Sequence, residues 1–439
     1  MSDGATTMTS ASRSSAPESY AVIGGEGFLG AALVSELLAH HPTSHVASLG
    51  LTQRRFSPAS YRFFHTDITS LPSLCSALQQ SGATTVFHAA SPHANASAEV
   101  WQKVNVEGTR VVVEACRQAG VRKLVFTSSA TVVFEGEALK DVDERIPTVD
   151  VEGEKGEPTY VSTKAKAEKI VLDANGKDGL LTCSLRLSGI IGPGDRQVIP
   201  GFIAVHKSGQ SAFQMGANQN LFDFVTVRNV VHAHLLAAER LDAPPVPPSA
   251  FEERLPPVAC TIKRRRLPTS AHPEVINSSN ALSSSSSEGA PLPASRTRFN
   301  QFYPPTLPPA GHSVAGRSFF ISNGEPVPFW SFARAVYCAY SGEPTSWIVR
   351  LPSALGMAIA GACEWAGWVV GKRPEECGIN RKHMQYVLSD MYFDIERARR
   401  LLGYEPIESL EEGIRSAVEW YKEDEAKQKR KQEEASKTK

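Results

Sequence analysis

The fold is decided near the N-terminus by the stretch Tyr20-Ala21-Val22-Ile23-Gly24-Gly25-Glu26-Gly27-Phe28-Leu29-Gly30. Its first four residues are apolar, as in a short buried strand, and the residues after it have the apolar spacing of a helix. Glycines between a strand and a helix let the backbone approach a pyrophosphate, whose charge then rests at the helix N-terminus. An ordinary surface turn is the alternative. We predict a dinucleotide-binding turn formed by Gly24, Gly27, Phe28, Leu29 and Gly30.

Strands and helices alternate from this turn to about residue 131, which predicts an α/β fold with a parallel sheet covered by helices on both faces. In such sheets, ligands bind beyond the carboxyl ends of the strands. Several of these ends carry small or polar residues that can lie against a dinucleotide, namely Asp67, Ile68, Ala89, Ala90 and Ser91.

The end of the second strand, Val46–Gly50, bears on the choice of cofactor. A site selective for NAD usually has an acid there, which binds the ribose hydroxyls. Gly50 stands at that place instead, and Arg54 and Arg55 follow it. The cofactor is therefore NAD or NADP, and the arginines favour the 2′-phosphate of NADP.

A second motif begins at Pro158, near the start of a predicted helix. Tyr160 and Lys164 are four residues apart, so they lie on one face of that helix. A neighbouring ammonium lowers the pKa of a phenol, which would let Tyr160 exchange a proton with a substrate hydroxyl. Ser129 follows a strand at residues 123–126 and is expected to face the same crevice.

Together these residues resemble the extended short-chain dehydrogenase/reductase superfamily, with its G-x-x-G-x-x-G turn, its later serine and its Tyr-x-x-x-Lys helix. The resemblance implies a Rossmann-type doubly wound sheet with a smaller, mostly helical C-terminal substrate region. It also implies that Tyr160 transfers the proton, that Lys164 holds the nicotinamide ribose, and that Ser129 orients the substrate oxygen. Asn105 matches a structural and proton-relay asparagine, and Leu187 stands where the superfamily usually has a proline near the nicotinamide.

Residues 126–136, 189–197, 220–224 and 321–330 narrow the resemblance to the 3β-hydroxysteroid dehydrogenase/isomerase branch. Within it, they are most similar to enzymes that oxidise and decarboxylate 4α-carboxysterols. The resemblance implies a sterol or steroid substrate and a place on the cytosolic face of the endoplasmic reticulum membrane, with the cytoplasm as the alternative. Ile23, Gly50 and Leu187 depart from the family pattern, in place of a threonine, an acid and a proline.

Two other functions stay open at this point. One is another reaction of the superfamily, such as ketone reduction or nucleotide-sugar epimerisation. The other is a non-catalytic NADP-binding sensor or scaffold, although such proteins generally lose the tyrosine or the lysine that this chain retains.

The composition suggests five segments along the chain. A Ser/Thr-rich N-terminus, 1–17, and an insertion, 242–315, are expected to be disordered, because neither can bury enough apolar area. The insertion holds the basic run 263–266, for which a solvated loop is the plainest interpretation. The folded parts are a Rossmann domain at 18–241 and a C-terminal region at 316–422, followed by a charged tail at 423–439.

One apolar stretch, 351–370, is long enough to cross a bilayer but contains Pro352, Glu364 and many small residues. It is interpreted as a buried or substrate-covering helix, an interfacial helix, or a span. Trp365 and Trp368 share a face and suit the headgroup region, so membrane association is one expected partnership.

Charge and cysteine content exclude some classes of protein. The formal net charge is zero, so no basic field indicates a nucleic-acid partner. The 7 cysteines are scattered without a C-x-x-C pair, which predicts neither a disulfide framework nor a metal site. A homodimer is left open.

Overall fold

The computed structural model describes residues 18–41, 44–53, 59–93, 96–149, 158–247, 312–371 and 380–437. The N-terminus 1–17, most of the insertion with its basic run 263–266, and Arg54 lie outside these ranges.

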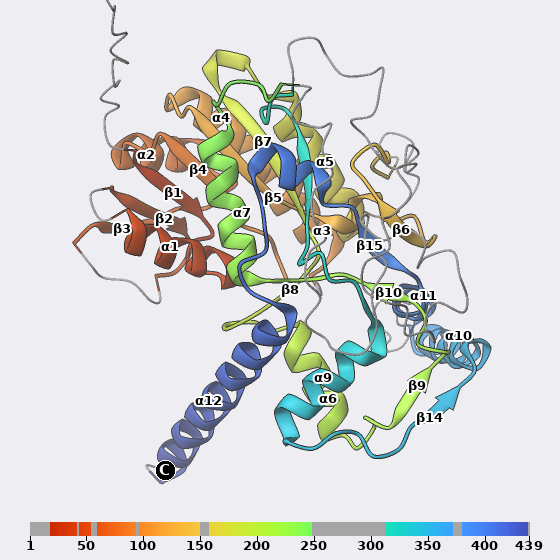
Figure 1. Cartoon of the computed structure of the whole chain (residues 1–439). Coiled ribbons are helices and arrows are strands. Elements are labelled where there is room, and N and C mark those ends of the chain that lie inside the picture. Colours follow the sequence, from red (N-terminus) through yellow and green to blue (C-terminus); the bar gives the residue numbers. More distant parts are fainter. Residues whose placement is uncertain are drawn as a thin grey trace, which may run out of the picture.

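Seven parallel strands form the central sheet, in the spatial order β12-β7-β5-β4-β1-β2-β3 (Figure 1). The strand order reverses between β1 and β4, which is where an open α/β sheet binds its ligand. This arrangement confirms the doubly wound Rossmann-type sheet. The strands are β1 (Tyr20–Ile23), β2 (Val46–Gly50), β3 (Tyr61–His65), β4 (Thr85–His88), β5 (Lys123–Ser129), β7 (Leu181–Leu187) and β12 (Ser318–Ile321).

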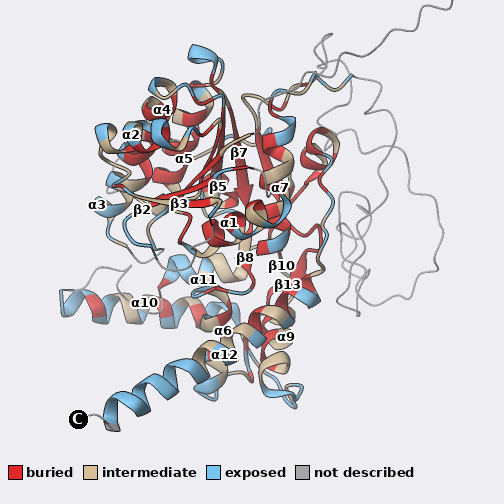
Figure 2. Cartoon of the chain, turned by 90° about the vertical axis from the view of Figure 1, so that its left-hand side faces the viewer, coloured by how far each residue is buried: buried red, intermediate tan, exposed pale blue. Residues whose placement is uncertain are grey.

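Helices cover both faces of the sheet and enclose two separate apolar cores, which Figure 2 shows as buried strands between helices. Strand β1 is buried along its whole length, and its sequence, Tyr20–Ile23, is accordingly a short continuous apolar run. On one face, α1 (Phe28–His40) packs against α7 (Val227–Arg240). On the other lie α2 (Leu71–Ser81), α4 (Thr109–Gln118) and α5 (Tyr160–Asp173).

The sheet is not completed within the predicted domain 18–241. Its last strand, β12, pairs in parallel with β7 from beyond the insertion, with Ser318 opposite Ser184. The two ends of the segment 248–311 lie side by side, because Val246 and His312 exchange backbone hydrogen bonds of 2.8 and 2.9 Å. The boundary at 241 therefore corresponds to the start of the insertion and not to the edge of the sheet.

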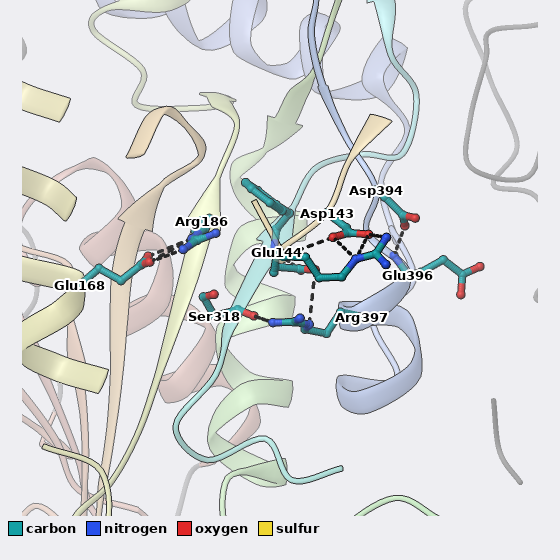
Figure 3. Close-up of polar contacts among 10 residues, drawn as sticks. Asp143, Glu144, Glu168, Arg186, Ser318, Asp394, Glu396 and Arg397 are labelled. Carbon is teal, nitrogen blue, oxygen red and sulfur yellow. Dashed lines mark hydrogen bonds and ion pairs between the residues drawn. The ribbon is translucent and has the colours of Figure 1, made fainter. Parts of the chain in front are cut away.

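Two side chains, Glu144 from the Rossmann domain and Arg397 from the C-terminal region, close the outer edge of β12 (Figure 3). Glu144 accepts a hydrogen bond from the backbone N–H of Phe320 at 2.8 Å and pairs with Arg397 at 3.4 Å. Arg397 in turn donates to the Ser318 carbonyl at 3.2 Å. These contacts occupy polar groups of an edge strand that would otherwise be open to pairing.

The C-terminal region is mostly helical, as predicted. Short strands that local sequence did not indicate come both from this region and from residues 139–226. A four-stranded sheet has the order β13-β10-β15-β6, and two further pairs are β11-β8 and β14-β9. The bounds are β6 (Leu139–Val142), β8 (Gly189–Ile191), β9 (Phe213–Met215), β10 (Leu221–Phe222), β11 (Phe224–Thr226), β13 (Val327–Pro328), β14 (Val349–Leu351) and β15 (Met391–Phe393).

Among the described residues, four α-helices follow β13, and α6 (Val198–Lys207) packs against the first and the last of them. The last, α12, continues through the charged tail to Lys437 and leads away from the rest of the molecule (Figure 1). The helices after β13 are α9 (Phe329–Ser341), α10 (Ser353–Val369), α11 (Arg381–Leu388) and α12 (Leu410–Lys437).

Candidate active site

The glycine turn after β1 meets the end of β4, as the sequence predicts. Gly24 has a φ of +84°, and a Cβ on it would lie 3.0 Å from the backbone of Ala90. The N–H of Ala89 donates to the Ile23 carbonyl at 3.0 Å, which fixes this approach. The residues at the ends of β1 and β4 therefore form one surface that only small residues allow.

The geometry of this turn fits a dinucleotide. Gly27 is the N-cap of α1 and has no side chain with which to cap it, so no cap side chain occupies the N-terminus of the helix. Free N–H groups at such an end bind a phosphate. Phe28, in the first turn of α1, contacts the loop at Gly194, where an added Cβ would lie 3.2 Å from its ring.

The next strand ends hold the residues predicted to meet the adenosine. Asp67 accepts hydrogen bonds from the backbone and the hydroxyl of Thr69, both at 2.8 Å, and these lower its pKa. Ile68 packs against Gly108. Gly50 ends β2 as predicted, and a Cβ there would meet nothing within 4 Å. Whether Arg54 contributes stays a prediction.

Helix α5 begins at Tyr160 for a local reason. Thr159 is its N-cap: the Thr159 hydroxyl accepts from the Ser162 N–H at 3.1 Å, and the Ser162 hydroxyl accepts from the Thr159 N–H at 3.0 Å. This reciprocal cap fixes the first turn. Tyr160 is thereby held at the end of the helix nearest the strand ends.

Ser129 lies beside the phenol of Tyr160, as predicted. It ends β5, opposite Leu187 at the end of β7. Its hydroxyl lies 2.8 Å from that of Thr131, and its hydrogen bonding with Tyr160 lowers the tyrosine pKa. The three residues Ser129, Tyr160 and Leu187 therefore meet at one edge of the sheet.

The electrostatics of Tyr160 differ from the prediction. Burial is the larger effect and raises the Tyr160 pKa, and the group that lowers it is Ser129 rather than Lys164. The Lys164 ammonium donates to the Thr127 carbonyl at 2.6 Å and lies 4.4 Å from the centroid of the Phe126 ring. Burial lowers the Lys164 pKa to about 7, although Glu168 opposes this shift.

His88, at the end of β4, is a packed residue, as its isolation in the sequence indicates. Its Nε2 lies 3.0 Å from the Thr109 hydroxyl, and its ring packs on Phe126. Burial, followed by the charge of Lys164, lowers the His88 pKa to about 3. The imidazole is neutral at physiological pH and adds no charge to the site.

Asn105 joins α5 to the end of β4 by hydrogen bonds. Its amide donates to the Thr163 hydroxyl at 3.1 Å and accepts from the Ser91 hydroxyl at 3.3 Å. It lies in a π-helical segment, Gln102–Gly108, between α3 (Ala98–Trp101) and α4. Such segments often mark functional sites. The structure thus brings Asn105 and Ser91 together next to α5.

A buried ion pair holds α5 against β7 (Figure 3). Glu168, two turns after Tyr160, accepts from Arg186 at 2.6 and 3.0 Å and from the Ser184 hydroxyl at 2.9 Å. The Glu168 and Arg186 side chains are only 2% and 5% exposed. This pair, which the sequence reading missed, positions Tyr160 relative to the sheet.

Two aromatic residues that the sequence reading also missed border Tyr160. Trp101 meets its ring edge-on at a centroid distance of 6.2 Å. Tyr386, from α11, is close enough that Tyr160 contributes to raising the Tyr386 pKa, after the larger effect of burial. Phe134 packs edge-on against Tyr386. Aromatic side chains therefore border the Tyr160 phenol, and they come from segments that only the folded chain brings together.

Helix α10 buries small residues and exposes large apolar ones, which is the reverse of a core helix. Its buried residues are small, Gly356, Ala360 and Gly367, and the side of the helix opposite them carries large apolar residues. The described part of the chain contains no helix that combines the length and the apolar character required to cross a bilayer. The exposed large apolar residues of α10 are Leu355, Ile359, Trp365, Trp368 and Val369.

Comparison with known proteins identifies the family. The model of the 3-beta hydroxysteroid dehydrogenase/isomerase family matches residues 21–252. The decarboxylating sterol-4-alpha-carboxylate 3-dehydrogenase of Schizosaccharomyces pombe is 32% identical over 92% of this chain and 98% of its own length. The decarboxylating sterol-4-alpha-carboxylate 3-dehydrogenase of Homo sapiens is 30% identical over 91% and 87%.

Solved structures share the fold at low identity. The dTDP-glucose 4,6-dehydratase of Bacillus anthracis, in complex with NAD, has a TM-score of 0.58 at 16% identity and covers 93% of this chain and 98% of its own. The UDP-glucose 4-epimerase of Thermotoga maritima, with UDP-glucose, has a TM-score of 0.57 at 18% identity, covering 92% and 99%. At these identities the likeness is one of fold.

Proposed function

The chain belongs to the 3-beta hydroxysteroid dehydrogenase/isomerase family, and we propose that its Tyr160 site oxidises the 3β-hydroxyl of a 4α-carboxysterol. The observation that carries the proposal is the meeting of Tyr160, Ser129 and Leu187 at the strand ends, next to the glycine turn. The names of relatives that align over more than nine-tenths of the chain support the choice of substrate.

The cofactor in this proposal is NAD or NADP. The N-terminus of α1 would hold its pyrophosphate, and the surface of Gly24 and Ala90 would lie against it. When bound, the nicotinamide supplies an acceptor for the C3 hydride. The buried Ser188 hydroxyl at the end of β7 has no partner within the described residues, so it can serve a ligand at this edge.

The residues of the chain move the proton. Ser129 donates to or accepts from the substrate oxygen and orients it toward Tyr160. Tyr160 takes the hydroxyl proton as the C3 hydride leaves. Because burial raises the Tyr160 pKa, the phenolate needs a nearby cation when it forms. Lys164 lies one turn away and can supply it once its own ammonium is charged.

The chemistry of the substrate accounts for the decarboxylation. Oxidation at C3 converts the 4α-carboxylate into a β-keto acid. The C4–carboxyl bond then breaks, carbon dioxide leaves, and the electron pair passes into the new carbonyl as an enolate that takes up a proton. This step requires no further catalytic residue.

Turnover with matched sterols tests the proposal. The full-length protein with NAD or NADP is given a 4α-carboxy-3β-hydroxysterol labelled at the carboxyl carbon, or the same sterol without the carboxyl group. We expect reduced cofactor and labelled carbon dioxide in equal amounts with the first. Cofactor reduction without labelled carbon dioxide would contradict the 4α-carboxysterol assignment. Cofactor binding without reduction by any sterol would instead favour the sensor alternative.

We also propose that the outer face of α10 docks on a lipid bilayer, at the cytosolic face of the endoplasmic reticulum. Trp365 and Trp368 are 68% and 73% exposed, and residues of this kind favour the headgroup region. A sterol is dissolved in that bilayer, so docking would bring the substrate to the site. Lys372 and Arg373 follow the helix in the sequence and would suit anionic headgroups.

Flotation with neutral and anionic phospholipid vesicles tests the docking. Replacing Trp365 and Trp368 together by serine should lower bound protein at least fivefold, while activity toward a detergent-solubilised sterol stays within twofold. The matched control is Trp347→Ser, which removes an exposed tryptophan that lies outside α10. Equal loss of binding in the control, or no loss in the double variant, would contradict docking through α10.

A further inference from the structure

The glycine turn contains a buried acid that the dinucleotide fingerprint does not require. Glu26 lies between Gly25 and Gly27 and is 8% exposed. The Tyr61 hydroxyl donates a hydrogen bond of 2.5 Å to its carboxylate. Burial and this contact both raise the Tyr61 pKa, so the phenol stays protonated and keeps donating at physiological pH.

The contact with Tyr61, the first residue of β3, places the carboxylate on a definite side of β1. Tyr61 belongs to β3, the outermost strand on the β1-β2-β3 side of the sheet. Tyr160 and Ser129 lie on the other side of β1, at β5 and β7. A dinucleotide crossing the glycine turn with its nicotinamide at Tyr160 therefore has its adenosine on the side of Glu26.

The end of β2, which usually carries an acid that binds the cofactor ribose, carries Gly50 here and so has no side chain. A Cβ on Gly50 would have open space around it, so nothing in the described residues fills that position. Ser48, two residues earlier on the same face of β2, lies against Gly25, next to Glu26. The neighbouring turn thus contains an acid, Glu26, that the end of β2 lacks.

We propose that Glu26 is the acid that selects NAD over NADP in this chain. The 2′-phosphate of NADP would bring up to two negative charges to the side of β1 on which the turn holds this buried carboxylate. Repulsion between such charges is strong where water is excluded. The free 2′-hydroxyl of NAD is neutral and can donate to a carboxylate. This inference reverses the expectation drawn from Gly50 and the arginines.

The inference rests on the proposed dinucleotide site. A direct measurement of cofactor binding tests the site and the role of Glu26 separately. Calorimetry on the full-length protein would measure the affinity for NAD⁺ and NADP⁺ without any sterol. The wild type should bind NAD⁺ at least tenfold more tightly than NADP⁺. Glu26→Ser should raise the ratio of NADP⁺ to NAD⁺ affinity at least tenfold, and Glu26→Gln, which preserves the size of the side chain, should raise it in the same direction.

The matched control is Glu36→Gln, which removes a carboxylate from the exposed side of α1, the helix that follows the turn, where it pairs with His40. Its affinity ratio should stay within twofold of the wild type. Equal changes in both affinities at Glu26 would mean that it acts on the pyrophosphate or on folding, and would overturn the inference. A wild type that prefers NADP⁺ would also overturn it, and a wild type that binds neither would overturn the dinucleotide site itself.

Discussion

Helices α5 and α10 differ in what their apolar and polar faces contact. Buried polar bonds hold helix α5 in place: Arg186 of the sheet donates to Glu168, and Asn105 of the π-helical segment donates to Thr163. Helix α10 packs through small residues and turns its large apolar side chains outward. The first arrangement holds a reacting group within fractions of an ångström, and the second leaves a surface free for an apolar partner.

The difference suggests a division of tasks between the two helices. Precise placement requires satisfied buried polar groups, whose loss is costly. A docking surface requires exposed apolar area, whose loss hardly changes the folded state.

The largest effect is expected at the reacting end of α5. Tyr160→Phe keeps the ring and its packing on Trp101 but removes the proton acceptor, so turnover should fall at least about a thousandfold. The affinity for NAD⁺, measured by calorimetry, should change less than about threefold, because in the proposed mechanism the phenol acts on the substrate proton and not on the cofactor. Activity that survives this change would contradict the proposed role of Tyr160.

The next effect is expected where α5 is anchored. Glu168→Gln leaves the buried Arg186 guanidinium without its counter-charge and should lower the free energy of unfolding by about 3–4 kcal/mol. The matched control on the same helix is Lys169→Ala, which breaks the exposed pair with Asp173 and should cost less than about 0.5 kcal/mol. Urea unfolding measures both. Similar values for the two variants would show that the anchor is not a buried ion pair in solution.

Much of the sheet could be predicted because its strands are locally marked. Tyr20–Ile23 and Val46–Gly50 are short apolar runs next to glycines, and both are strands with these bounds. The helix at Tyr160 was also predictable, from Pro158 and the helix formers that follow. Strand β12 was harder to predict, because its four residues pair with β7, from which the insertion separates them in the sequence. Residues 393–402 were also hard to predict, because the end of β15 is followed within a few residues by a short π-helical segment, Ala398–Leu402.

The candidate site was predictable where its residues form a motif and unpredictable where they meet by folding. Tyr160, Lys164 and the glycines have fixed spacings, so sequence places them on one helix face or one turn. Trp101 and Tyr386 come from distant segments, and no spacing connects them to Tyr160. The direction of the Lys164 ammonium, toward the Thr127 carbonyl, depends on a tertiary contact that no local pattern contains.

A smaller effect is expected from the titration of Lys164. Its pKa falls from 10.5 to about 7 on burial, so between these values the unfolded chain binds more protons than the folded one. Stability contributed by this position therefore rises with pH across that window. In cofactor-free protein, the wild type should gain about 2–3 kcal/mol relative to Lys164→Met between pH 7 and pH 9. Urea unfolding at both pH values measures the difference, and a constant difference would mean that Lys164 stays charged.

The smallest effect is expected on the outer face of α10. Trp365→Ala and Trp368→Ala remove exposed rings, so each should change the free energy of unfolding by less than about 0.5 kcal/mol. The matched control is Ala360→Leu, on the buried side of the same helix, which should destabilise by about 1–3 kcal/mol through overpacking. A loss of more than about 1 kcal/mol from either tryptophan variant would mean that the ring is covered in solution by protein. In that case the contrast with α5 would disappear, because α10 too would be held by its own contacts rather than left available to a bilayer.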